Sequence, residues 1–153
     1  MNFNKLILSL SIIFLGLNLY AQLPNKLERV EGTWTYAKGS GTEEFYIYGD
    51  TLFGVASLKD KYGDKVPVEA ISIKMVNGNL VYVSKKMEGD SITLQKSIFV
   101  SKGKKLKFYN TETQLTEAIK YRVGWFNRNK LIIIIYTADH QKRKLKLYKN
   151  NEE

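Results

Sequence analysis

The chain has 153 residues, no cysteine and a formal net charge of +9, with 44% hydrophobic and 25% charged residues. This composition is typical of a globular protein rather than a disordered one, and the length suits one domain with its own core. The absence of cysteine excludes disulfides, a cysteine nucleophile and the lipid-modified cysteine of a lipoprotein.

The first element along the chain is an apolar N-terminal segment. Residues 6–17 form an almost unbroken apolar run, which follows Lys5 and precedes the small residue Ala21. This pattern predicts a secretory signal peptide over residues 1–21, because the run is short for a membrane span. We therefore expect residues 22–153 to form one exported, soluble domain in the periplasm or outside the cell.

A short helical segment is expected next, over residues 24–31. Its apolar residues fall on one face of a helix, and they are Leu23, Leu27 and Val30. Gly32 ends this segment, and Trp34 lies at the start of a region that is rich in strand signals. The chain therefore enters its main fold through one or two helical turns.

Ten segments with strand signals follow at short spacing, with turn signals such as Asn77-Gly78 between them. The expected strands are residues 33–38, 42–48, 51–58, 66–76, 80–85, 91–100, 105–109, 118–126, 131–137 and 143–149. This pattern predicts an all-β fold, a single antiparallel up-and-down β-barrel of about 8–10 strands with a short N-terminal helical turn. A β-sandwich is the main alternative.

Residues 131–135, with the sequence Leu-Ile-Ile-Ile-Ile, depart from the alternation of a half-exposed strand. Five consecutive apolar residues imply that both faces of this strand are covered. We expect the segment of residues 23–30 to cover the outer face, in preference to a second subunit. The chain is therefore predicted to be a monomer.

The positive charge is concentrated in the last third of the chain. Residues 22–101 contain ten basic and ten acidic residues, whereas residues 102–149 contain thirteen basic and three acidic residues. The positive electrostatic potential of this region favours anionic partners. The predicted export of the protein argues against nucleic acid as one of them. The lysines expected on the outer face are Lys102, Lys104, Lys105, Lys107, Lys142, Lys144 and Lys146.

Motifs of common catalytic sites are absent from the sequence. H-E-x-x-H, G-x-S-x-G and the P-loop do not occur. His140 is the only histidine, so it cannot form a multi-histidine metal site. We interpret it as a turn residue, and the alternative of an axial haem ligand rests on fold analogy alone. We therefore predict that the protein is not an enzyme and that it uses neither a cofactor nor a metal ion.

Acidic residues beside apolar positions are candidates for polar anchors inside the barrel. Glu69 shares a strand face with Ile71, and one of the neighbours Glu43 and Glu44 must also point inward. A buried carboxylate must have a partner or stay protonated. Alternatively, Glu69 lies near a strand end, in contact with water and without a special function. The candidate partners are Arg122 and Arg143.

Seven short stretches of the sequence, taken in their order along the chain, indicate a resemblance to a protein family. They are Gly32-Thr33-Trp34, Glu44-Phe45-Tyr46, Thr51-Leu52-Phe53-Gly54-Val55, Glu69-Ala70-Ile71-Ser72-Ile73, Leu80-Val81-Tyr82, Phe108-Tyr109-Asn110 and Ile119-Lys120-Tyr121-Arg122. Their order resembles a small family of exported, uncharacterised bacterial proteins with a lipocalin-like barrel. The resemblance extends over about residues 27–125. It implies that Trp34 closes one end of the barrel beneath an arginine, either Arg122 or Arg143.

The chain departs from this family at Ser57, where the family often has an arginine, and in one later segment. The family tends to carry Asn-Pro-x-His-Asp-Phe-Pro where residues 110–116 read Asn-Thr-Glu-Thr-Gln-Leu-Thr. The histidine–aspartate pair is thus replaced by Thr113-Gln114. The resemblance therefore supports the fold and argues against catalysis, and it supplies no function because the family has no established one.

The predicted function is the binding of a small apolar or amphipathic ligand inside a barrel that is not an enzyme. The expected ligand-binding residues are Trp34, Glu44, Tyr46, Phe53, Glu69, Ile71, Tyr82, Tyr121 and Arg122. An open interior pocket would favour this function. A filled interior would favour the alternative, an envelope interaction module that binds anionic lipid or polysaccharide through its basic last third.

Overall fold

The computed structural model describes most of the chain after the predicted signal peptide. The described residues are 23–88, 91–112, 115–124 and 126–150. The predicted signal peptide, residues 1–21, lies outside the described residues. Within the described part of the chain, no helix has the length and apolar character needed to cross a membrane.

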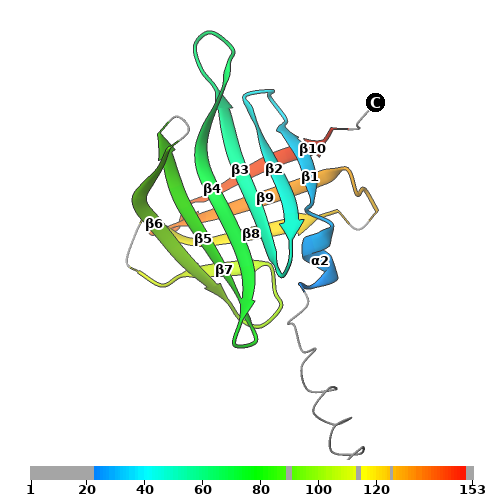
Figure 1. The fold of residues 1–153 in the computed structure, drawn as a ribbon, viewed down its shortest axis with the longest axis vertical. Helices are drawn as coiled ribbons and strands as arrows, with labels where there is room; N and C mark the ends of the chain where they lie inside the picture. The colour runs from blue at the N-terminus through cyan, green and yellow to red at the C-terminus, as the bar shows by residue number, and fades with distance from the viewer. Residues whose placement is uncertain (1–22, 89–90, 113–114, 125, 151–153) are drawn as a thin grey trace, which may run out of the picture.

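The protein is a closed barrel of ten antiparallel strands, in which consecutive strands pair and β1 pairs with β10 (Figure 1). The strands are β1 (Gly32–Tyr36), β2 (Gly41–Tyr48), β3 (Thr51–Lys59), β4 (Lys65–Val76), β5 (Asn79–Glu88), β6 (Ser91–Ser101), β7 (Lys107–Asn110), β8 (Thr116–Val123), β9 (Lys130–Thr137) and β10 (Lys142–Lys149). The predicted all-β up-and-down barrel is therefore confirmed, and the sandwich alternative is excluded.

The turns between strands follow the signals in the sequence. Asn77 and Gly78 both adopt positive φ, of 47° and 79°, between β4 and β5. This conformation suits a two-residue hairpin turn, whose twist matches that of the flanking strands. The odd-numbered strands β1, β3, β5, β7 and β9 run toward the end of the barrel opposite α2 (Figure 1). We call this end the mouth.

A helical turn, α2 (Asn25–Glu28), lies at the other end of the barrel. Leu27 and Val30 are fully buried there, and Trp34 Nε1 donates a hydrogen bond of 2.7 Å to the Val30 carbonyl. Packing and this hydrogen bond together fix the entering chain to the first strand. The predicted helical turn is thus confirmed, and it is shorter than the expected residues 24–31.

The cation beside Trp34 is a lysine rather than the expected arginine. Lys149 Nζ lies 5.6 Å from the centroid of the Trp34 ring, because the two residues are directly opposite in the β1–β10 pair. Arg122 is exposed on β8 and Arg143 is exposed near the mouth. Gly32, at φ 118°, leaves room for the lysine, since a Cβ there would lie 2.7 Å from Lys149 Cε.

The apolar run of residues 131–135 is covered within the chain, but the expected covering segment is wrong. The helical segment packs into the end of the barrel and not against the outer face of β9. Ile134 faces outward and is only 4% exposed. It lies between Lys120 of β8 and Lys144 of β10 in the register. Lysines at these positions can place their aliphatic stems over an outward apolar residue and keep their ammonium groups in water.

Candidate functional site: a polar cavity inside the barrel

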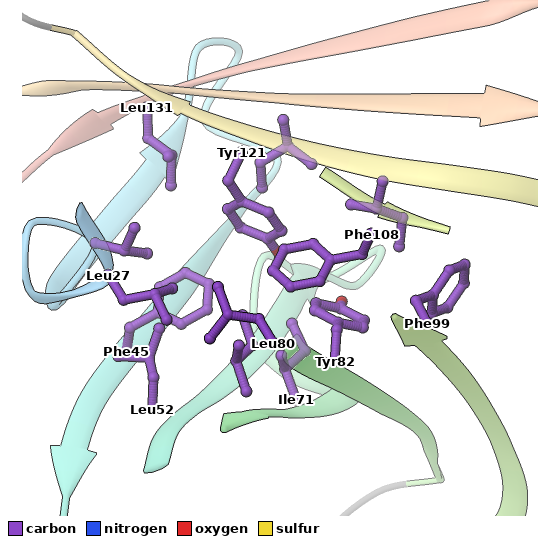
Figure 2. Close-up of a cluster of buried hydrophobic side chains, with 14 of the residues drawn as sticks. Leu27, Phe45, Leu52, Ile71, Leu80, Tyr82, Phe99, Phe108, Tyr121 and Leu131 are labelled. Atoms are coloured by element: carbon purple, nitrogen blue, oxygen red, sulfur yellow. The ribbon is translucent and has the colours of Figure 1, made fainter. Parts of the chain in front are cut away.

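The barrel interior next to α2 is filled with apolar and aromatic side chains. Figure 2 shows that these side chains converge from the helical segment and from strands all around the barrel. The labelled residues are Leu27, Phe45, Leu52, Ile71, Leu80, Tyr82, Phe99, Phe108, Tyr121 and Leu131. We call this half the packed end.

A cavity of about 240 Å³ occupies the mouth side of the interior. One wall is mainly polar and comes from β1, β2, β4, β5 and β6, with the residues Tyr36, Glu43, Glu69, Ser84 and Ser97. The other wall is mainly apolar and comes from β8, β9 and β10, with the residues Ile119, Ile133, Ile135 and Leu145. The cavity is therefore amphipathic across the barrel.

Two carboxyl groups face this cavity from the same level of β2 and β4, with β3 between them. Glu43 of β2 is opposite Ala56 of β3, and Ala56 is opposite Glu69 of β4. With strands roughly 4.8 Å apart, the two glutamates are separated by about 10 Å at their Cα atoms. The negative charge of Glu69 contributes to the raised pKa of Glu43.

Glu43 has a buried oxygen atom with no hydrogen-bond partner. The Tyr36 hydroxyl donates to Glu43 Oε1 over 2.6 Å, whereas Glu43 Oε2 has no hydrogen-bond partner among the described residues. Burial raises the pKa of Glu43 to about 7, and the charge of Glu69 acts in the same direction. The hydrogen bond from Tyr36 opposes this rise. The site therefore holds a carboxyl group that titrates near neutral pH.

Glu69 is the better satisfied of the two carboxyl groups. The Ser84 hydroxyl donates to Glu69 Oε1, and Tyr82 is a second hydrogen-bond donor. Burial still raises the pKa of Glu69 above its ordinary value. The hydroxyl groups of Tyr82 and Tyr121 share a further hydrogen bond. Burial raises the pKa of both tyrosines well above 10, so they remain neutral donors.

Five of the nine residues that the sequence predicted for the site lie inside the barrel. Glu69, Ile71, Tyr82 and Tyr121 line the cavity together. Trp34 is fully buried in the packed end and does not line the cavity. The structure thus brings four of the nine predicted site residues together in the cavity.

The other four predicted residues do not face the interior. Glu44 is exposed and lies 3.9 Å from Lys65, and Arg122 is exposed on β8. Tyr46 and Phe53 stack on each other on the outer surface, with ring centroids 5.6 Å apart. Each alternates with a buried neighbour, since consecutive strand residues point to opposite faces. The expectation that these four line the interior is wrong.

The sequence prediction missed Tyr36, Ser84 and Ser97, and of the neighbours Glu43 and Glu44 it chose Glu44 for the site, whereas Glu43 lines the cavity. A signal for Glu43 was present, because it is two positions from Phe45 and shares its inward face. The predicted partners Arg122 and Arg143 form no ion pair with Glu43 or Glu69 within the described residues. The partners are the hydroxyl groups of tyrosine and serine instead.

Nothing in the described residues forms a cluster of three or more acidic, histidine or cysteine side chains that would hold a metal ion. His140 lies in the turn between β9 and β10 with φ 60°. It is not among the residues that line the cavity. The chemistry of the cavity is thus that of carboxyl and hydroxyl groups.

Comparisons of the chain with protein-family models, curated proteins and solved structures give no match. The resemblance to exported lipocalin-like proteins therefore stays a prediction. The functional interpretation depends on the geometry of the barrel interior.

Proposed function

We propose that the protein is an exported, non-enzymatic barrel that binds a small amphipathic ligand in its interior cavity. A hydrogen-bond-donating or cationic group of the ligand binds to Glu43, and its apolar part contacts the wall formed by β8, β9 and β10. The observation that carries the proposal is Glu43 Oε2, a buried acceptor without a partner.

The free energy of binding favours a ligand that donates a hydrogen bond to Glu43 Oε2. A buried acceptor that lacks a hydrogen bond costs about 1–3 kcal/mol, and more when it is charged. A ligand that donates to Glu43 Oε2 recovers this cost. A cationic group gains further, because it stabilises the ionised forms of Glu43 and Glu69 and lowers the pKa of both.

The volume of the cavity limits the size of the ligand. The volume of the cavity is about 240 Å³. Pockets for drug-sized ligands are larger, at about 300–1,000 Å³. A short amphipathic amine or alcohol fits these limits, whereas a fatty-acid carboxylate would place a third acid beside Glu43 and Glu69.

Three probes with the same six-carbon chain test this proposal: hexylamine, hexanol and hexanoate. We expect calorimetry above neutral pH to give the tightest binding for hexylamine and the weakest for hexanoate. Glu43→Gln should weaken hexylamine binding about tenfold or more, because a charge-assisted hydrogen bond is lost. It should change hexanol binding much less.

Glu44→Gln is the matched control, since it makes the same change one position away on the outer face. It should leave the affinity for all three probes unchanged. Hexanoate binding as tightly as hexylamine would contradict the proposed role of Glu43. No binding of any probe at millimolar concentration would contradict the proposed function itself.

A further inference from the structure

A second hollow, of about 550 Å³, lies on the outside of the barrel. It is bounded by the α2 segment, the segment between β6 and β7, β7 itself and the end of β8. Its cationic residues are Lys26, Arg29, Lys102, Lys105, Lys107, Lys120 and Arg122. The remaining lining residues are Leu106, Tyr109, Tyr121 and Val123, so no acid is among the described residues of the lining. We call this hollow the basic groove.

The basic groove is distinct from the interior cavity. Of the residues that line the two sites, they share only Tyr121, whose ring points into the barrel (Figure 2). The cationic side chains of the groove come from the outer faces of β7 and β8, from the α2 segment and from the segment between β6 and β7. A ligand in the groove would therefore contact a different set of functional groups from a ligand in the cavity.

The strand register places like charges directly opposite each other in the groove. Lys107 of β7 is opposite Lys120 of β8 on the same outer face. Like charges in this arrangement destabilise a sheet. Neither lysine has an ion-pair partner among the described residues. An anion in the groove would remove this repulsion.

Aromatic rings position two of the ammonium groups without neutralising them. Lys107 Nζ lies 4.9 Å from the Tyr109 ring centroid and 4.8 Å from that of Tyr136. Lys102 Nζ lies 5.8 Å from the Tyr109 ring. Each cation–π contact occupies one side of an ammonium group, so rings occupy two sides of Lys107 Nζ, and the positive charge stays in place. These lysines therefore remain able to donate hydrogen bonds to an anion.

We propose that the basic groove binds an anionic ligand that carries at least two phosphate groups. The lining includes five lysines, whose charge only several negative charges can balance, and phosphate oxygens accept many charge-assisted hydrogen bonds. Arg122 can bind phosphate with two parallel hydrogen bonds, and the lysines act as point charges. Leu106 and Val123 provide an apolar wall beside the charged groups.

Sodium tripolyphosphate is the probe for this proposal, measured by calorimetry with the full domain. The groove variant is Lys107→Gln with Lys120→Gln. The matched control is Lys85→Gln with Lys96→Gln, because these exposed lysines are also directly opposite each other, in the β5–β6 pair and away from the groove. Both double variants lose the same charge, and thermal melting establishes that each is folded.

The unmodified domain should bind tripolyphosphate, and the groove variant should bind it about tenfold or more weakly. The control variant should lose less than about twofold, since distant surface charges are screened. Equal losses in the two variants would overturn the proposal, because binding would then follow net charge alone. Absence of binding by the unmodified domain would also overturn it.

A second arm identifies the source of the phosphate groups. Vesicles of phosphatidylcholine with and without cardiolipin, a lipid with two phosphate groups, are mixed with the same three proteins and sedimented. Binding to the anionic vesicles that tripolyphosphate displaces, and that the groove variant loses, would assign the groove to lipid head groups. Tripolyphosphate binding without vesicle binding would assign it to a soluble phosphorylated compound. Vesicle binding that the groove variant retains would overturn the groove as a lipid site.

Discussion

Replacing Glu43 by glutamine is the most informative change in the barrel interior. The substitution keeps the shape of the side chain and removes its ability to ionise. Glu43 is only 4% exposed, and Tyr36 can still donate to the amide oxygen. The amide nitrogen would take the place of an oxygen that has no partner. The main effect should therefore be on the pH dependence of stability.

The magnitude follows from the pKa of Glu43. A rise from 4.5 to about 7 on folding corresponds to about 3 kcal/mol at 1.36 kcal/mol per pH unit. Between these pH values the folded protein holds a proton that the unfolded chain has lost. The free energy of unfolding therefore falls as the pH rises, by roughly 1.4 kcal/mol per unit, and the loss is complete above pH 7. Glu69, whose pKa is also raised, adds a loss of the same sign.

Urea denaturation from about pH 4 to about pH 8 measures this dependence. Glu43→Gln should be more stable than the unmodified protein at pH 8, by up to about 3 kcal/mol, and similar to it near pH 4. Glu44→Gln, on the exposed side of the same strand, should keep the slope of the unmodified protein. A Glu43→Gln protein with an unchanged slope would refute the argument that the buried carboxyl group titrates with folding.

Two further predictions concern the packed end of the barrel. Trp34→Phe should cost about 1–3 kcal/mol in urea denaturation, because it leaves the Val30 carbonyl without its donor, and equal stability would contradict the anchoring role of this hydrogen bond. Gly54→Ala should cost about 1–3 kcal/mol, because its Cβ would lie 2.6 Å from the Phe45 ring. Adding Phe45→Leu should recover part of the Gly54→Ala loss, and strictly additive losses would show that the two residues do not compete for space.

The strands were predictable because their signals are local. Alternation of apolar and polar residues and the turn residues between strands depend only on neighbouring positions. The strand β3 (Thr51–Lys59) differs from its expected range by a single residue. β8 (Thr116–Val123) differs more, and it carries a register irregularity between Thr116 and Ala118. Such an irregularity arises from the pairing of β8 with β9. The sequence of β8 alone carries no information about this pairing.

The site was predictable only in part, because it depends on which face of each strand turns inward. Tyr121 is buried, and alternation alone places its neighbour Arg122 outside. The same argument selects Glu43 over Glu44 once Phe45 is taken as a core residue. What the sequence could not provide is the cross-strand alignment of Glu43, Ala56 and Glu69, since this depends on the lengths of two hairpins.

The pairing of β1 with β10 has a consequence for how the chain folds. Thr35 Oγ1 donates a hydrogen bond of 2.7 Å to Asn150 Oδ1, a contact between residues 115 positions apart. Closure of the ring therefore waits for almost the whole domain to be present, and pairings so distant in sequence are slow to form. Until then β9 has an open edge, and its run of isoleucines is free to pair with another chain. The last strand to be synthesised thus completes the barrel and also protects it from aggregation.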